Sequence, residues 1–375
     1  MSLVGLVIGD PHFSLSNIKE VDTFIEKSVR AVRLFKPDFV VCAGDCLDSH
    51  EKCHMEPFIR AMRFLSELAK HTPTFLTVGN HDRKNNSDFM SDDHFFTGLK
   101  HCPNLTIVDK AIKQEIVSKK DPTVKGNFLF VPYVYPGRFY EALDTIDLSE
   151  FEDTWRSPYI DAIFCHQEFR GVQMGPFKSE IGDIWDVSWP LVISGHIHEY
   201  QVLQSNMIYV GTPMQHTFSE KLDKAIVMFN FNIKYLEEAN ITLEEVSSLE
   251  ALVPDPLMRA RYARIKLDLC VKRTVTLTVS QVAGFRPPPN EKTRVIIRGT
   301  ASEIRALTKS KGLDRLTKLG VKFSTIPIEE VKTQASGSAE LIKPKKFIAR
   351  FRELIAEDQD LLPVFDSLFA RVELV

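Results

Sequence analysis

Two histidines in the stretch SGHIHEYQ (194–201), His196 and His198, follow a glycine at the end of an apolar run. Four more apolar runs end in residues that donate through nitrogen or oxygen, namely Asp10 and His12 in VIGDPH, Asp45 in CAGD, Asn80, His81 and Asp82 in TVGNHD, and His166 in IFCHQ. Imidazole, carboxylate and amide donors without thiolates suit Mn²⁺, Fe²⁺ or Zn²⁺. They outnumber the ligands of one four-coordinate ion, and a shared carboxylate can bridge two ions about 3.5–4 Å apart. The pattern therefore predicts a two-metal centre that hydrolyses phosphoesters.

Each of these residues also has a purely structural explanation. A single histidine after a strand is often only a hydrogen-bonding residue. Asp10 or Asp45 could cap a helix, and Asn80 could hold a turn. Coincidence alone would have to place such residues after five separate strands, and this favours the metal centre.

The elements that must position these residues are seven apolar runs separated by helical patterns. Near-continuous Val, Ile, Leu and Phe is typical of strands that are buried on both faces. The runs are 3–9, 39–44, 74–79, 128–133, 161–165, 190–195 and 225–231, and helices are expected over 17–36 and 55–70. Ligands of an open α/β sheet bind beyond the carboxyl ends of its strands, so the candidate ligands should converge on one edge. The sequence predicts a layered α/β domain over 1–235.

The rest of the chain is expected to form three parts. After a loop-like stretch ending in VPDP, strand-like segments at 264–271, 294–300 and 321–328 and a helix around 302–319 predict a small α+β module over 257–331. Residues 332–343 have linker composition. Residues 344–375 carry two amphipathic helical stripes, which either fold back onto the body or await a partner.

Charge is unevenly distributed behind the net charge of −3. Acidic residues outnumber basic ones in 1–256, and the reverse holds in 257–332. The basic block could bind a polyanion, remain a solvated surface, or dock on its acidic neighbour. The six cysteines form no CxxC pair, no apolar run reaches 18 residues, and the N-terminus is typical of a strand rather than a signal peptide. We therefore expect an intracellular protein with free thiols and no membrane segment.

The motifs DPH, GD, GNHD, H and GHIH, in this order, resemble those of the calcineurin-like metallophosphoesterases over about the first 230 residues. The resemblance implies that family's β-sandwich flanked by helices. It also implies two metal sites bridged by Asp45, one formed by Asp10, His12 and His198 and the other by Asn80, His166 and His196. His81 would stabilise the transition state or protonate the leaving oxygen, and Asp82 would orient His81.

Within this superfamily the chain is similar to the SbcD family, the nuclease subunits of SbcC–SbcD double-strand-break repair complexes. The similarity lies in SGHIHEYQ followed by IYVGTPMQHTFSE (208–220), in the small module after the core, and in the terminal helices. DPHFS and GDCLD stand where that family usually has DxHLG and GDLFD, which leaves loop shape and substrate access open. The protein phosphatase motifs GDxVDRG and GNHE are not matched, because this chain has GDCLDS and GNHDR. Cyclic-nucleotide phosphodiesterases of this type usually end soon after the core, whereas this chain of 375 residues continues well beyond it.

This resemblance implies a DNA exo/endonuclease subunit that holds two Mn²⁺ ions, with Fe²⁺ or Zn²⁺ as alternatives. The implied partners are DNA, a second copy of the chain, and an SbcC-like ABC-type ATPase bound by 344–375. Candidate contacts to the DNA backbone are Arg83, Lys84, Arg170 and Lys178. The stripe Phe58, Met62 and Leu65 could join the subunits of a homodimer, although core packing explains it slightly better.

Other interpretations of the sequence stay open. The compact length is typical of phage or viral versions, which would act in the infected-cell cytoplasm, whereas cellular ones act in the cytoplasm or nucleoid. The substrate could instead be a small or cyclic nucleotide. A non-catalytic scaffold with this fold is a third possibility, but such scaffolds usually lose ligand residues, and all seven predicted ligands are present.

Overall fold

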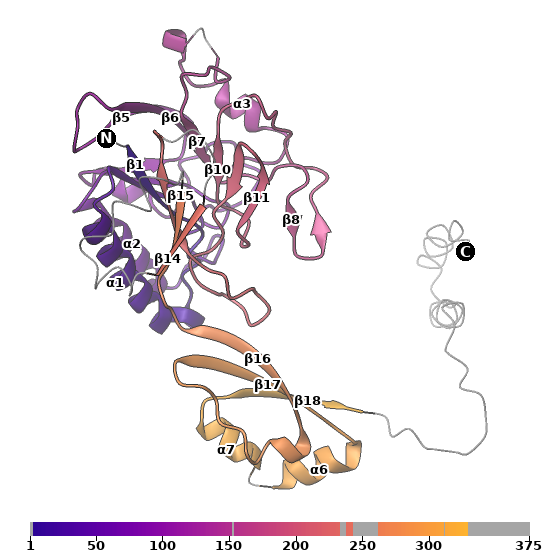
Figure 1. Cartoon of the computed structure of the whole chain (residues 1–375). Coiled ribbons are helices and arrows are strands. Elements are labelled where there is room, and N and C mark those ends of the chain that lie inside the picture. Colours follow the sequence, from indigo (N-terminus) through magenta and orange to yellow (C-terminus); the bar gives the residue numbers. More distant parts are fainter. Residues whose placement is uncertain (1–2, 152–153, 233–237, 243–261, 311, 329–375) are drawn as a thin grey trace, which may run out of the picture. The chain divides into compact units, whose positions relative to one another are not determined.

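The computed structural model describes residues 3–151, 154–232, 238–242, 262–310 and 312–328 (Figure 1). One compact unit spans Met1–Ile326, and the second, Pro327–Val375, lies almost wholly outside the described residues. The predicted linker at 332–343 and helical tail at 344–375 are therefore outside them as well.

Two sheets form the body of the first unit. The larger has the strand order β14 (Glu238–Thr242), β15 (Tyr262–Lys266), β13 (Ile226–Asn230), β1 (Val4–Ile8), β2 (Phe39–Cys42), β3 (Thr74–Thr77) and β4 (Leu105–Val108). The smaller has the order β11 (Gln201–Gln204), β12 (Met207–Tyr209), β10 (Val192–Ser194), β7 (Ala162–Cys165), β6 (Lys125–Val131) and β5 (Ile112–Val117). Strands β1 to β4 are parallel, as are β6, β7, β10 and β12. The carboxyl ends of each parallel set therefore share one edge.

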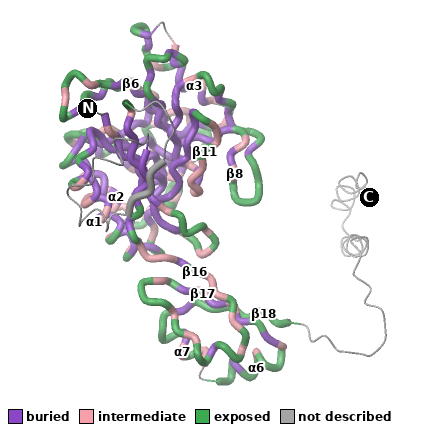
Figure 2. Tube along the Cα trace, viewed as in Figure 1, coloured by how far each residue is buried: buried purple, intermediate pink, exposed green. Residues whose placement is uncertain are grey.

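Three apolar clusters hold these layers together. One contains side chains of both sheets, including Val41 and Phe164, and so lies between them. A second joins the outer face of the larger sheet to helices α1 (Ile18–Phe35) and α2 (Met55–Ala69). The third covers the outer face of the smaller sheet and includes helix α3 (Phe139–Leu143). Figure 2 shows this buried interior, and the predicted layered α/β architecture with flanking helices is confirmed.

Helix α1 follows the predicted pattern closely. Its apolar positions Val21, Ile25 and Val32 are buried, which is the spacing that places side chains on one helix face. The helix ends where Lys36 adopts a left-handed conformation (φ 49°) and its backbone N–H donates to the Val32 carbonyl.

A small module has its own sheet and core. Its strands β16 (Val271–Thr278), β17 (Glu291–Gly299) and β18 (Lys322–Pro327) are ordered as named, and helices α6 (Ala301–Lys309) and α7 (Gly312–Lys318) follow β17. Six buried residues form its core: Val282, Val295, Ile297, Leu307, Leu316 and Val321. A two-stranded hairpin, β8 (Gln173–Met174) and β9 (Phe177–Lys178), projects from the body.

Two sequence predictions for this region are wrong. The expected strand 264–271 is divided between β15 of the larger sheet and β16 of the small module. The division arises because Ile265 of β15 packs in the apolar cluster between the larger sheet and helices α1 and α2. The expected helix around 302–319 is interrupted, since Ser310 takes extended backbone angles and its hydroxyl donates to the Leu307 carbonyl. The domain boundaries themselves stay a prediction.

The six cysteines are free thiols. No helix within the described residues is long and apolar enough to cross a membrane.

Candidate active site

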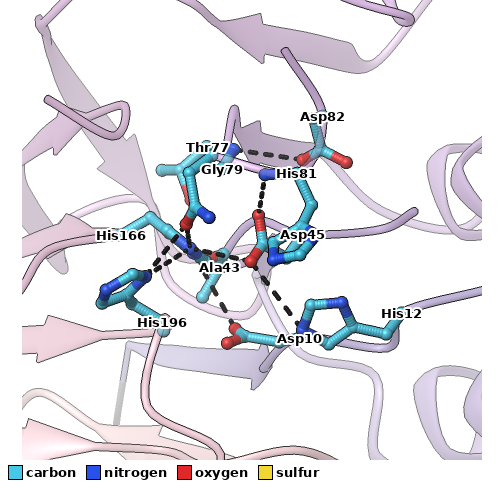
Figure 3. A network of polar contacts seen from close by, with 12 residues as sticks. Asp10, His12, Ala43, Asp45, Thr77, Gly79, His81, Asp82, His166 and His196 are labelled. Carbon is cyan, nitrogen blue, oxygen red and sulfur yellow. Dashed lines mark hydrogen bonds and ion pairs between the residues drawn. The ribbon is translucent and has the colours of Figure 1, made fainter. Parts of the chain in front are cut away.

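The seven predicted metal ligands, His81 and Asp82 follow the carboxyl ends of five strands, and Figure 3 labels all of them except Asn80 and His198. Strands β1, β2 and β3 of the larger sheet lead to Asp10 and His12, to Asp45, and to Asn80, His81 and Asp82. Strands β7 and β10 of the smaller sheet lead to His166 and to His196 and His198. The expectation of a single sheet edge is therefore corrected, because two sheet edges meet at this point.

One group of donors is centred on the fully buried His166 and includes the buried Asn80 and the partly buried His196. The Asn80 Oδ1 atom lies 3.0 Å from His166 Nε2 and 3.0 Å from His196 Nδ1, and the two nitrogens are 3.3 Å apart. The Asp45 Oδ2 atom lies 3.2 Å from His166 Nε2. The His166 Nδ1–H donates to the Ala43 carbonyl at 2.6 Å, which turns the Nε2 lone pair towards the group. We call Asn80, His166 and His196 the buried group.

A second group lies on the other side of Asp45. The Nε2 atoms of His12 and His198 are 3.0 Å apart, and His12 Nε2 is 3.8 Å from Asp45 Oδ2. Asp10 is fully buried, and neither of its carboxylate oxygens has a hydrogen-bond partner among the described residues. Asp10, His12 and His198 can bring one donor atom each to within 4.8 Å of one another, as can Asp45, His166 and His196. We call Asp10, His12 and His198 the outer group.

These distances fit ligands that surround an ion. With bonds of roughly 2.1 Å, neighbouring ligand atoms are about 3.0 Å apart in an octahedral shell and about 3.4 Å apart in a tetrahedral one. The separations between His12 and His198 and between His166 and His196 lie at 3.0 and 3.3 Å. Two imidazole nitrogens at this separation can share an N–H···N hydrogen bond in the metal-free protein, whereas a bound cation would accept both lone pairs. The Asp10 carboxylate accepts no hydrogen bond from the described residues, and its ion-pair partner among them, His166 Nδ1, is 3.9 Å away, so a cation would stabilise it.

In the protein alone, burial favours the uncharged form of three of the candidate ligands. Burial raises the pKa of Asp10 to about 6, with the nearby Asp45 carboxylate adding to the rise. Burial lowers the pKa of His196 to about 3, with His166 adding to the fall, and burial also lowers the pKa of His12. The imidazoles of His12 and His196 are therefore neutral, the form that binds metals. At His166 the effect of burial is outweighed by the Asp45 and Asp10 carboxylates, which raise its pKa to about 9, so a metal ion would have to displace a proton there. Bound divalent cations would reverse the cost of burying the carboxylates.

Three of the candidate ligands have a strained backbone. His12, Asp45 and His196 have left-handed φ values of 42°, 47° and 76°, a conformation that usually persists only where the surroundings enforce it. Gly44 has a positive φ of 102°, as expected of a glycine before a sharp turn. Gly79 allows a close approach instead, since a Cβ there would collide with Asp45.

His81 lies beside the outer group, but Asp82 does not orient it. The His81 ring is edge-on to His12 with centroids 4.9 Å apart, and its Nδ1–H donates to the Asp48 carbonyl at 3.1 Å. The Asp82 carboxylate instead accepts the backbone N–H groups of Leu47 (3.2 Å) and Gly79 (3.1 Å). The predicted role of Asp82 is thus wrong, because this side chain joins two ligand-bearing loops (Figure 3).

Sequence reasoning missed residues next to the outer group. His216 is partly buried, donates from Nε2 to the Asp10 carbonyl at 3.2 Å, and packs edge-on against His12. Asp48 lies 3.5 Å from His12 Nδ1, and Glu220 lies 3.9 Å from His198 Nδ1. These residues follow no buried strand at a fixed spacing, so the only signal was their presence in GDCLDS and HTFSE.

The four candidate DNA contacts have different surroundings. Arg83 is only 2% exposed, and its guanidinium donates to the carbonyls of Tyr133 and Asp88, so it is unsuited to meet a DNA backbone and that prediction is corrected. Lys84 is exposed and pairs with Asp93. Arg170 is exposed and donates to the Glu180 carbonyl, and Lys178 is exposed on the β8–β9 hairpin.

Comparisons with known proteins agree with this geometry. Residues 6–200 match the family model described as "Calcineurin-like phosphoesterase". "Putative phosphoesterase 078R" of Invertebrate iridescent virus 3 is 35% identical over 92% of this chain and 96% of its own length. "Putative phosphoesterase 244L" of Invertebrate iridescent virus 6 is 35% identical over 82% of this chain and 97% of its own length.

Proposed function

The chain belongs to the calcineurin-like phosphoesterase family, and we propose that it is a Mn²⁺-dependent nuclease that hydrolyses phosphodiester bonds of DNA. The observation that carries the hydrolytic part is the pair of donor groups that share Asp45. The calcineurin-like fold uses a dinuclear metal site, and these groups provide candidate ligands for both ions. Mn²⁺ is our choice among the ions that suit a mixed nitrogen and oxygen donor set.

The chain's own residues would divide the work of hydrolysis. When bound, the two ions would supply a nucleophile near neutral pH and stabilise the charge of the transition state. Asp45 would hold the two groups at a fixed separation from its position between them. His81, which the Asp48 carbonyl orients, would donate a proton to the leaving oxygen or stabilise its charge.

Charge supports DNA as the substrate. The body is acidic, whereas the small module exposes basic side chains on its strands, its helices and one loop: Arg273, Arg286, Lys292, Arg298, Arg305, Lys309, Lys318 and Lys322. Such a surface attracts a polyanion through the release of counterions. Lys178 and Arg170 add exposed positive charge after β7, the strand that carries His166.

Two partner proposals accompany this function. Helix α2 exposes Met55 (75%) and Ile59 (54%), an apolar surface that could join two copies of the chain. Leu65 of the predicted dimer stripe is buried, and Phe58 and Met62 pack against the core, which agrees with core packing for those residues. Binding of an SbcC-like ATPase by residues 344–375 rests on the sequence alone, because they lie outside the described residues.

The substrate proposal is tested with purified full-length chain and Mn²⁺. Labelled linear duplex and single-stranded DNA are compared with cyclic dinucleotides at equal phosphodiester concentration. Cleavage of DNA with at least tenfold higher kcat/KM supports a nuclease. Preference for the small nucleotides would favour a nucleotide phosphodiesterase, and no cleavage of either would favour a scaffold.

A further inference from the structure

Residues 212–224, which we call the bridging loop, connect β12 to β13 and contact the outer group. The Glu220 carboxylate lies 3.9 Å from His198 Nδ1. The Lys224 ammonium donates to the His198 carbonyl at 3.0 Å, and the Thr212 N–H donates to the same carbonyl at 3.1 Å. The loop therefore contacts His198 at both its ring and its backbone.

Glu220 also organises the bridging loop itself. Its carboxylate accepts the N–H groups of His216 at 3.3 Å and Thr217 at 3.1 Å, and it pairs with the Lys224 ammonium at 2.9 Å. The Glu220 side chain is 11% exposed, whereas the side chain of His198 is 42% exposed. The carboxylate is thus the less exposed partner and is held by contacts of its own, so it can influence the orientation of the more exposed imidazole.

The small module holds the bridging loop through Lys272 of β16. The Lys272 N–H donates to Gln215 Oε1 at 2.7 Å, and Gln215 Nε2 donates back to the Lys272 carbonyl at 3.1 Å. The Lys272 ammonium donates to the carbonyls of Gln215 (2.7 Å) and His216 (3.0 Å). Lys272 is only 7% exposed, so the carbonyls of this loop, rather than water, solvate its ammonium group.

We propose that Glu220 is a positioning residue for His198 and that Lys272 keeps in place the loop that carries Glu220. At 3.9 Å from Nδ1 the Glu220 carboxylate acts on His198 through its charge, which favours the tautomer with the proton on Nδ1 and leaves Nε2 free for the metal position. The small module is then coupled to the outer group, while the buried group is independent of it. The proposal rests on the two-metal function proposed above.

The test is Mn²⁺ titration of the full-length chain by calorimetry and by electron paramagnetic resonance. Glu220→Gln should weaken one of two Mn²⁺ sites by roughly 10–100-fold and leave the other unchanged. Glu220→Asp, which keeps the charge, should give an intermediate affinity. Lys272→Met should weaken the same site less, by at least about threefold.

Two matched variants serve as controls. Glu141→Gln removes a carboxylate whose ion pair with Arg138 involves neither His198 nor the bridging loop. Lys292→Met removes a different contact of the same module with the body, the ion pair with Glu20. Both should titrate like wild type.

Specific outcomes would overturn the proposal. Glu220→Gln with two wild-type affinities would do so, as would equal weakening of both sites together with a lowered melting temperature, which indicates a merely structural role. A wild-type chain that binds no Mn²⁺ would instead refute the two-metal function itself.

Discussion

The two groups of the candidate metal centre differ in how they are held. The buried group is fixed by the sandwich: His166 is fully buried, bonds to the Ala43 carbonyl, and shares Asn80 with His196. The outer group depends on a later part of the chain, because the side chain of His198 is 42% exposed and contacts the bridging loop. One group is therefore held by the core alone, whereas the other is held by the core at Asp10 and His12 and by the bridging loop at His198.

The largest effect should come from the residue that both groups share. Asp45→Asn removes the charge between them and should lower turnover by at least about a thousandfold, because metal ions supply several kcal/mol of stabilisation to the transition state. Both Mn²⁺ affinities should fall in the same titration. Asn80→Ala should also abolish cleavage, but it should weaken only the ion of the buried group. Loss of one site alone in Asp45→Asn would contradict the bridging position of this carboxylate.

Removing His81 should separate chemistry from metal binding. His81→Ala should lower turnover by about 10²–10⁴-fold, the range for a positioned proton donor. Both Mn²⁺ ions should remain, because His81 lies beside the outer group and is held by the Asp48 carbonyl. Unchanged cleavage of DNA by this variant, measured under single-turnover conditions, would refute the role of His81.

In the metal-free protein, the buried Asp10 carboxylate of the outer group should lower the free energy of unfolding at neutral pH. Burial raises the folded-state pKa of Asp10 from 3.8 to about 6, so its contribution to stability is present below about pH 4 and is lost as pH rises through about 6. Asp10→Asn has no such titration. The free energy of unfolding of wild type should therefore fall relative to Asp10→Asn by up to about 3 kcal/mol between pH 4 and pH 8.

This comparison is made by urea unfolding in a chelator. Added Mn²⁺ should reverse the difference, because the cation favours the charged Asp10 carboxylate. If the difference in free energy of unfolding between the two chains does not change with pH, burial of the ionised Asp10 carboxylate does not create a need for a cation.

The smallest effect on activity should come from Asp82. Asp82→Asn keeps one acceptor for the N–H groups of Leu47 and Gly79 but loses the second, which should lower the free energy of unfolding by about 1–3 kcal/mol. Turnover should change less than tenfold, because the Asp48 carbonyl is the partner of His81. A loss as large as that of His81→Ala would restore the orienting role that the sequence suggested.

The sequence was sufficient for the strands that end in ligands and for helices α1 and α2. Their apolar runs are continuous or strictly helical, as at Val21, Ile25 and Val32, and such periodicity survives without tertiary context. It could not assign the strands to two sheets, because pairing between β7 and β10 depends on packing across the sandwich. Short or half-exposed strands such as β11 and β12 were missed for lack of a pattern.

The site divides in the same way. Ligand candidates follow strands, so their positions could be predicted, whereas Glu220 and His216 lie in a loop whose path only the fold determines. The roles of Arg83 and Asp82 were mistaken because burial cannot be read from one charged residue in a turn. Both side chains stabilise the turn after β3 through contacts with backbone groups.

The most direct test of the two-metal centre is a crystal structure of the full-length chain with Mn²⁺, with anomalous scattering used to locate the ions. We expect two anomalous peaks about 3.5–4 Å apart. Asp45 should lie between them, with Asn80, His166 and His196 around one peak and Asp10, His12 and His198 around the other. A single peak, or two peaks that do not share Asp45, would contradict it.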